Sequence, residues 1–457
     1  MKTSWQKVDR LLLAIAAVCY AVFAGWLTVR NYPWQTGDTP HYLELAQALK
    51  RGVFGVVTGS HFEPEAWRQP GYPAFLALVS AVASSTATVI VLQHLLILIS
   101  IVLMFVLLRR HVDVQTARMF LLATMVYPFL ADSAARLMPE ALCLFLLTCC
   151  IFAMCSEAQV SPLFVGVLAA SLGLVRPNLV LLPLVCVIAY ALAGRLYARK
   201  AVVTLVTATL LLSLWAYRNH RQFARFSPLP PASGAGSVLM FAAWETRLSS
   251  DSLFQYGRGG VITPEMRRSG MLELQAEINS RVATPRDRYF LVPDSYDTNQ
   301  QKIAADKILT AEALRMIAAA PGAYAWRTLL NLPRIWFSAA VKSSMPARQR
   351  YAMVAVGLTM FVLAVWGWCR LLPAGLESRH PLLSMLLLIP LYFTGTLCWF
   401  QHEARYTIPA RVVLLAVAAV PLASFAAAFH LGQRETVEEV SRTGEQRAKS
   451  AGGVQGV

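Results

Sequence analysis

The sequence predicts an all-α polytopic membrane protein with about ten transmembrane helices, external interfacial helices and one large external loop. Of the 457 residues, 56% are hydrophobic and only 14% are charged, whereas soluble domains carry about 25% charged residues. The apolar residues also fall into runs that approach or reach the roughly 20 residues needed to cross a bilayer. This composition excludes a soluble enzyme of this size, because too few charged residues remain to cover its surface.

The expected spans follow the apolar runs in chain order. They cover 11–29, 87–108, 116–133, 139–155, 162–175, 178–194, 200–216, 352–371, 381–399 and 408–430. The two short runs in the middle meet at Arg176-Pro177, which predicts a tight hairpin of tilted helices.

Basic residues in the short loops indicate the orientation of the spans. Lys and Arg precede the first span, flank the second and third, and follow the sixth in the segment 195–200. With the N-terminus inside, all of these loops are cytoplasmic, as the positive-inside rule requires. An even number of spans then places the C-terminus inside as well. The chain is therefore expected in a bacterial inner (plasma) membrane with both termini cytoplasmic.

These spans divide the chain into four regions. They are an N-terminal transmembrane module 1–216 with a first external loop 30–86, a large external loop 217–351, C-terminal transmembrane helices 352–431, and a disordered cytoplasmic tail 432–457. Amphipathic or apolar stretches at 72–85 and 323–341 predict interfacial helices. The SGAGS stretch at 233–237 reads as a loop and not as a phosphate cradle, because no strand-like run precedes it.

Charge and cysteine usage narrow the class of partner. The net charge is +16, and the loop 217–351 carries 18 basic and 10 acidic residues, so half of that charge lies in one region. The basic residues sit between and beside spans, which favours membrane phosphates over nucleic acid. All eight cysteines lie inside apolar runs and are expected to be small buried hydrophobic residues. The sequence contains no tight acidic or His/Cys cluster that predicts a metal, and we expect no cofactor.

Ionisable residues that interrupt an apolar context gather at external span ends. They are Asp38, Tyr42, Glu63, Glu65, Arg68, Arg136, Glu140, Arg176, Arg218, Arg221, Glu403, Arg405 and Tyr406. Charges at the edge of the hydrocarbon are costly unless they are paired or solvated in a cavity, so one-sided clustering predicts a polar site there. Arginine is the side chain best suited to a phosphate.

Each residue also has a simpler interpretation. Asp38 could be a solvated loop residue, and Glu140 could be a first-turn acid that the helix dipole stabilises. Arg176 could extend to the lipid headgroups, and Glu403 could pair only with Arg405.

The order of these segments resembles the GT-C superfamily of polyprenyl-phosphate-sugar glycosyltransferases. The most similar branch is the bacterial one related to dolichyl-phosphate-mannose–protein mannosyltransferases and lipid A aminoarabinose transferases. The resemblance covers about 1–230 and 320–430, and Gln69 departs from the proline that the family usually has. The matching motifs are Asp38 and Tyr42 after the first span, RQPGYP at 68–73, Glu140 opening the fourth span, Arg176-Pro177, Arg218-Asn219, and Glu403, Arg405, Tyr406 and Pro409 near the end.

The resemblance implies an inverting transfer of a hexosyl or pentosyl group from a polyprenyl phosphate to a glycan, lipid or protein acceptor on the external face. In such a reaction Asp38 would be the general base and Glu140 would orient the acceptor or share that role. Because the leaving group is a phosphate, it needs positive charge, which Arg176, Arg218 and Arg405 could supply. Tyr42, Arg68, Glu403 and Tyr406 would hold the sugar or acceptor.

A non-catalytic flippase or polymer ligase for lipid-linked glycans is the alternative of a different class. A flippase needs polar groups along its spans through the membrane midplane, and the span centres of this sequence carry almost no charge. The sequence therefore favours the transferase.

Overall fold

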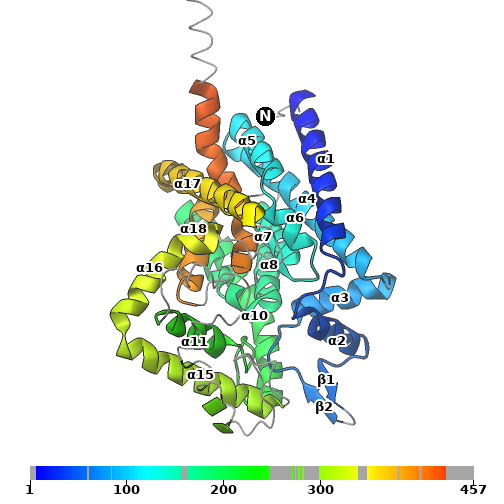
Figure 1. Ribbon diagram of the computed structural model, residues 1–457. Coiled ribbons are helices and arrows are strands. Elements are labelled where there is room, and N and C mark those ends of the chain that lie inside the picture. Colours follow the sequence, from blue (N-terminus) through cyan, green and yellow to red (C-terminus); the bar gives the residue numbers. More distant parts are fainter. Residues whose placement is uncertain are drawn as a thin grey trace, which may run out of the picture.

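The computed structural model describes residues 7–58, 61–83, 85–155, 162–247, 298–337, 347–378, 380–400 and 404–428, with a few positions between 270 and 281. All regular secondary structure in these residues is helical apart from one short antiparallel hairpin, in which Gly55 pairs with Pro64 (Figure 1). The predicted all-α class is therefore confirmed. The tail 432–457 and most of 248–297 lie outside the described residues.

The elements fall into three groups along the chain. The first group is α1 (Lys7–Arg30), α2 (Thr39–Lys50), β1 (Gly55–Thr58), β2 (His61–Pro64), α3 (Gly71–Val82), α4 (Thr86–His111), α5 (Val114–Met125) and α6 (Phe129–Ala134). The second is α7 (Glu140–Cys155), α8 (Pro162–Val175), η1 (Pro177–Leu179), α9 (Leu182–Ala193), η2 (Arg195–Tyr197) and α10 (Ala198–Phe223). The third is α11 (Ala235–Glu245), α15 (Asn299–Ala319), α16 (Pro321–Phe337), α17 (Ala347–Ser378), α18 (Pro381–Leu397), η4 (Ala404–Thr407) and a C-terminal helix over 408–428.

Five of the described helices are long and apolar enough to cross a membrane: α1, α4, α10 with η2, the 351–373 part of α17, and the C-terminal helix with η4. Four more expected spans correspond to the shorter apolar helices α7, α8, α9 and α18. Helices therefore form where the apolar runs predicted them, while the count of ten spans stays a prediction.

The run 116–133, expected as one span, forms two helices instead. Asp113 begins α5 by accepting a 2.7 Å hydrogen bond from the backbone N–H of Thr116, and α5 ends at Met125. Pro128 follows three residues later and is the residue before α6. A proline disfavours helical geometry in the residue before it and removes a backbone donor, so the apolar run cannot continue as one helix.

The SGAGS stretch, expected as a loop, contains the start of a helix. Only Ser233 and Gly234 precede α11, and Gly234 has φ of +71°, a left-handed conformation that glycine tolerates. The stretches expected as interfacial helices do form helices, α3 and α16.

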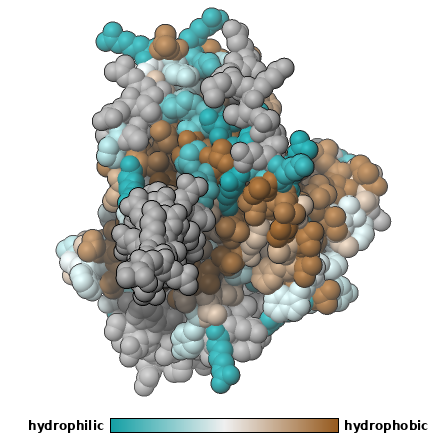
Figure 2. Space-filling model, turned by 90° about the horizontal axis from the view of Figure 1, so that it is seen from above, coloured by the Kyte–Doolittle hydropathy of each residue, from teal (hydrophilic) through white to brown (hydrophobic). Residues whose placement is uncertain are grey.

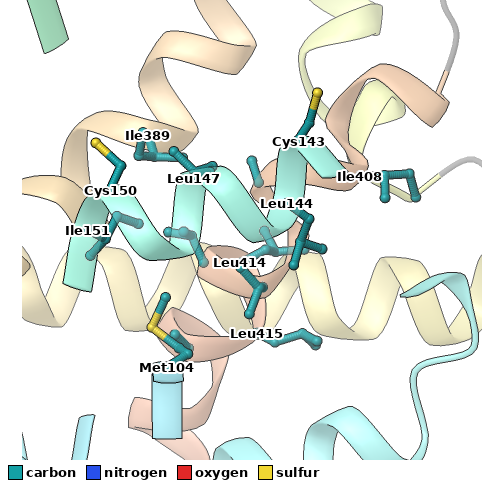
Figure 3. Packing of buried hydrophobic residues seen from close by; sticks show 14 of the residues in the cluster. Met104, Cys143, Leu144, Leu147, Cys150, Ile151, Ile389, Ile408, Leu414 and Leu415 are labelled. Carbon is teal, nitrogen blue, oxygen red and sulfur yellow. The ribbon is translucent and has the colours of Figure 1, made fainter. Parts of the chain in front are cut away.

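Helix α7 lies at the centre of the packed core. Its residues Leu144 and Leu147 are fully buried among side chains of α4, α18 and the C-terminal helix (Figure 3). Cys143 and Cys150 belong to the same buried face, as predicted for small apolar residues. This packing brings the start of α7, which carries Glu140, next to the start of the C-terminal helix.

Other helices present apolar side chains outwards. Val22 on α1 is 71% exposed and Leu214 on α10 is 68% exposed, and Figure 2 shows hydrophobic side chains gathered along one flank. Such faces are unfavourable in water and suited to lipid. Cys19 and Cys369 lie on exposed faces of this kind, so the prediction that every cysteine is buried is wrong for these two.

The two ends of the molecule are formed by different elements. Figure 1 shows the start of α1 and the end of the C-terminal helix at the top, and the β-hairpin, α11 and α15 at the bottom. At the upper end the buried Asp9 of α1 joins Arg109 of α4 and Arg118 of α5, at 3.1 and 2.9 Å. The two ends are thus built from different segments, and the candidate site lies toward the lower one.

Candidate active site

The segment between α1 and α2 is fixed to the segment that precedes α7. The backbone N–H of Leu137 donates to the Trp34 carbonyl at 3.0 Å, and the Thr39 hydroxyl donates to the Leu137 carbonyl at 3.3 Å. Asp38 is the residue before α2, and Pro40 in the first turn of that helix supplies no N–H that would need a partner. These contacts hold Asp38 near the start of α7.

The RQPGYP segment brings Arg68 to the same place. A Cβ on Gly71 would lie 2.7 Å from the carbonyl oxygen of Leu174, so only glycine allows α3 to begin against the end of α8. The next residue, Tyr72, is fully buried and donates from its hydroxyl to Gln93 of α4 at 2.8 Å. The backbone just before this anchor presents Arg68 toward Asp38.

Two guanidinium groups hold the Asp38 carboxylate. Arg68 donates to one oxygen at 2.7 Å and Arg405 donates to the other at 3.1 Å. Burial acts to raise the pKa of Asp38, but the charges and hydrogen bonds of the two arginines lower it further, so that the net pKa lies well below its ordinary value. Asp38 is therefore ionised throughout the physiological range.

A second ion pair lies beside the first. Glu140, the first residue of α7, forms a short contact with the guanidinium of Arg176, and both side chains are buried. The Tyr406 ring lies between two guanidinium carbons, 5.1 Å from that of Arg176 and 5.3 Å from that of Arg405. Such cation–π contacts hold the guanidiniums in place without neutralising their charge.

Tyr42 connects the two pairs. Its hydroxyl lies 3.4 Å from a guanidinium nitrogen of Arg68, and its ring lies 4.9 Å from the carbon of that guanidinium. Tyr42 is also within electrostatic reach of Arg176 and Glu140, and burial raises the pKa of its hydroxyl. The hydroxyl therefore stays protonated and can donate or accept a hydrogen bond.

A small cavity of about 60 Å³ adjoins these residues. Its lining includes Glu140, Arg405 and a fully buried arginine, Arg411, which the sequence analysis did not single out. Arg411 donates to the hydroxyls of Tyr127 at 3.0 Å and Thr407 at 3.2 Å. It is the one charged residue inside the apolar run 408–430, and that position is the signal that could have identified it.

Glu65 and Arg218 build a supporting turn. Glu65 accepts from the backbone N–H groups of Trp67 and Arg68, both at 2.7 Å, and from His41 at 2.8 Å. Arg218 donates to the backbone carbonyls of Glu65 at 2.8 Å and Phe54 at 3.1 Å. These contacts fix the backbone that leads to Arg68. The role of Arg218 as a phosphate ligand stays a prediction.

Several simpler interpretations can now be compared with the structure. Arg405 forms an ion pair with Asp38, so it does not pair with Glu403 alone. Glu403 lies outside the described residues. Arg176 is buried against Glu140 and does not extend to the headgroups. Gln69 departs from the proline of the family that the sequence resembles. Its side-chain amide donates a hydrogen bond to the Pro228 carbonyl at 2.9 Å.

The described residues therefore bring together Asp38, Tyr42, Arg68, Glu140, Arg176, Arg405 and Tyr406. Arg136 pairs with Asp132 at the edge of the cavity. No group of three or more His, Cys, Asp or Glu side chains that could hold a metal occurs in the described part of the chain. The arrangement offers two carboxylates and fixed positive charges around a small space, which suits the transfer of a group away from an anionic leaving group.

Comparison with solved structures finds the same fold in an archaeal enzyme. The oligosaccharyltransferase AglB from Archaeoglobus fulgidus, in complex with an inhibitory peptide and a dolichol-phosphate, matches 94% of this chain with a TM-score of 0.51 and 13% identity. The apo form of the A. fulgidus oligosaccharyltransferase matches 95% of it with a TM-score of 0.50 and 13% identity. The chain spans about half the length of these structures, 52% of each.

A weaker match is ArnT from Cupriavidus metallidurans bound to undecaprenyl phosphate, with a TM-score of 0.36 and 16% identity over 90% of this chain and 77% of that one. No protein-family model matches the sequence, and neither does any curated protein. The GT-C-like fold that the sequence indicated is thus confirmed by the structural match to the oligosaccharyltransferase.

Proposed function

We propose that this chain is an integral-membrane glycosyltransferase that moves a sugar from a polyprenyl phosphate to an acceptor hydroxyl or amine on the external face. The observation that carries the proposal is the Asp38 carboxylate held between Arg68 and Arg405, beside the buried pair of Glu140 and Arg176. The fold shared with an oligosaccharyltransferase that was studied with a dolichol-phosphate supports the donor class.

The reaction is a direct displacement at the anomeric carbon of the donor. The acceptor oxygen or nitrogen forms a bond to that carbon, the bond from the carbon to the phosphate oxygen breaks, and the configuration inverts. Asp38 takes the proton that the acceptor loses, and the lipid phosphate leaves with the bonding electron pair. One positioned carboxylate suffices, because no covalent enzyme intermediate has to be formed and broken.

Positive charge stabilises the phosphate leaving group. Arg405 is the most exposed member of the cluster, with a side chain 29% exposed, so an incoming phosphate can share its guanidinium with Asp38. The phosphate charge then offsets part of the field of Arg405. The Asp38 carboxylate becomes more basic when the donor is bound than it is in the empty site.

Glu140 is suited to orienting the acceptor. One of its oxygens contacts Arg176, while Oε2 is buried and has no hydrogen-bond partner among the described residues. A buried carboxylate oxygen without a partner costs free energy, and an acceptor hydroxyl in the adjoining cavity would supply the missing donor. We assign Tyr42 and Tyr406, which contact the arginines of the cluster, to holding the sugar or acceptor.

The experiment is a comparison of envelope lipids, glycans and proteins by mass spectrometry in a bacterial strain lacking the gene. We expect one sugar modification to disappear, to return with the wild-type gene, and to stay absent with Asp38→Asn expressed at the same level. Full restoration by Asp38→Asn would contradict the catalytic role. A lipid-linked glycan trapped on the cytoplasmic side would instead identify a flippase.

A further inference from the structure

A buried ion pair remote from Asp38 is not accounted for by the reaction. Arg327 of α16 is 2% exposed, and its Nε and Nη2 lie 2.7 and 2.6 Å from one carboxylate oxygen of Glu245, which ends α11 and is 3% exposed. Burying two charges costs several kcal/mol before their attraction is counted, so a surface location would have been less costly. The remaining contacts of Arg327 indicate why the pair is retained.

The same guanidinium holds the end of α18. Its Nη1 donates to the Cys398 carbonyl at 3.1 Å and its Nη2 donates to the Phe400 carbonyl at 2.5 Å. Tyr324, one turn earlier on α16, donates from its hydroxyl to the carbonyl of Trp399 between them. Helix α18 ends at Leu397, and the carbonyls of the cap residue Cys398 and of the two residues after it are all satisfied from one neighbouring helix.

Helix α16 also holds the chain after this segment. The Thr407 hydroxyl donates to the Ile335 carbonyl of α16 at 2.8 Å and accepts from Arg411. Arg405 lies between the two anchors, five residues after Phe400 and two before Thr407. Because the chain is held to α16 on both sides of Arg405, the position of α16 determines where the Arg405 guanidinium can lie.

We propose that Glu245 and Arg327 are positioning residues that set the Arg405–Asp38 contact. Glu245 orients Arg327, Arg327 fixes the carbonyls at 398 and 400, and Arg405, five positions after the second of these, contacts Asp38. The proposal rests on the proposed function in so far as Arg405 and Asp38 act in transfer. It connects the layer of α11 and α15, in which Asp306 of α15 accepts from the backbone N–H of Gly236 at 2.9 Å, to the reacting groups.

The first test is a pair of double-mutant cycles on turnover. Glu245→Gln keeps the size of the side chain and an acceptor for Arg327, and we expect about a tenfold loss of kcat from a slightly misplaced Arg405. In an Arg405→Gln background, Glu245→Gln should lower kcat by less than about twofold, because Glu245 acts on Asp38 through Arg405, which is already missing. In an Arg68→Gln background the loss should stay about tenfold. Equal losses in both backgrounds would overturn the proposal.

The matched control is the pair Glu312–Arg315 on α15, in which Arg315 is exposed, and Glu312→Gln there should leave turnover unchanged. If Glu245→Gln fails to fold, Tyr324→Phe takes its place, because it removes only the hydroxyl that contacts the Trp399 carbonyl. Its loss of kcat should be smaller, and it should again be reduced in the Arg405→Gln background and kept in the Arg68→Gln background. A loss of the same size in the wild-type and Arg405→Gln backgrounds would count against the proposal here too.

A second readout does not depend on activity. Hydrogen exchange followed by mass spectrometry should show faster exchange in peptides covering 398–407 of Glu245→Gln, with α2 and α8 unchanged. Unaltered exchange over 398–407 would overturn the positioning role. If the wild-type protein transferred no sugar but the exchange difference were present, the proposed function would fail while the positioning role stood.

Discussion

At the scale of single residues, the low pKa of Asp38 has a cost for the base role that we propose for it. A carboxylate held by Arg68 and Arg405 is always ionised but is a weak base, because proton affinity falls with pKa. A donor phosphate that competes for Arg405 would restore basicity only when there is a sugar to transfer. The empty site is thereby protected from unproductive protonation, and the strength of the base depends on the presence of the donor.

The first prediction concerns that carboxylate. Asp38→Asn keeps the size of the side chain but cannot take a proton, so turnover should fall on the order of 10²–10⁴, while donor binding is retained or tightened because the amide competes less for Arg405. The measurement is single-turnover transfer by purified protein in liposomes, with binding of the polyprenyl phosphate measured separately. Glu63→Gln on β2 is the control and should keep most of its activity. Near-native transfer by a folded Asp38→Asn protein would remove Asp38 from the mechanism.

The pair of Arg176 and Glu140 predicts a stability effect as well as a catalytic one. Arg176→Ala leaves a buried carboxylate uncompensated and should lower the free energy of unfolding by about 3–5 kcal/mol. Thermal unfolding in detergent measures this loss. Arg176→Lys should recover part of it, because the charge returns without the planar fork. The double variant Arg176→Met with Glu140→Leu should be stable yet inactive. An unchanged melting temperature in Arg176→Ala would show that the ion pair does not stabilise the folded protein.

Glu65 predicts a pH dependence of stability. Burial acts to raise the pKa of Glu65, but His41 and the backbone N–H groups of its turn lower it to about 2, below the ordinary 4.5. A lowered pKa means that the stabilisation is fully present above pH 4.5 and is lost as the pH falls toward 2. Melting temperatures across that interval should fall less steeply for Glu65→Gln than for the wild type. The exposed Glu44→Gln on α2 should follow the wild-type curve.

At the scale of elements, the approach of α3 to α8 determines where the arginines lie. A Cβ on Gly71 would lie 2.7 Å from the Leu174 carbonyl oxygen, immediately before Val175 and Arg176. Gly71→Ala should push these two helix ends apart, cost about 1–3 kcal/mol of stability and weaken donor binding. Gly395→Ala in α18 meets no atom within 4 Å and should be neutral or stabilising. Comparison of the two melting temperatures tests the contact, and equal values would contradict it.

At the scale of the whole molecule, the orientation in the membrane can be tested at the two ends of α10. Leu196 precedes this helix and is 95% exposed, while Phe226 follows it and is 63% exposed. The 26 residues of α10 span about 39 Å at 1.5 Å per residue, enough to separate the two sides of a bilayer. In a cysteine-free background, an impermeant maleimide on intact cells should label Phe226→Cys and spare Leu196→Cys. The opposite pattern would reverse the predicted topology.

Much of this arrangement could be predicted from the sequence, for identifiable reasons. Apolar runs locate helices because the hydrophobic signal is long, and the Arg176-Pro177 junction breaks a run where the structure has η1 between α8 and α9. The run 116–133 is expected as one span because it is apolar, although Pro128 within it indicates a break. The sequence also could not show that Arg405 pairs with Asp38, or that Arg218 supports a turn, because long-range partners are decided by packing.

The contact of Asp38 with Arg405 also bears on how the protein is made. The two residues are 367 positions apart, so ribosomes adding roughly 5–20 residues per second need on the order of tens of seconds to supply the partner. During that interval the N-terminal helices are already entering the membrane, while Asp38 still lacks Arg405, one of its two arginine partners. The site is completed only when the segment that carries Arg405, at the start of the last described helix, has been made. A nascent protein interrupted before that point would be inserted and yet inert, so no partly made copy could act on the donor lipid.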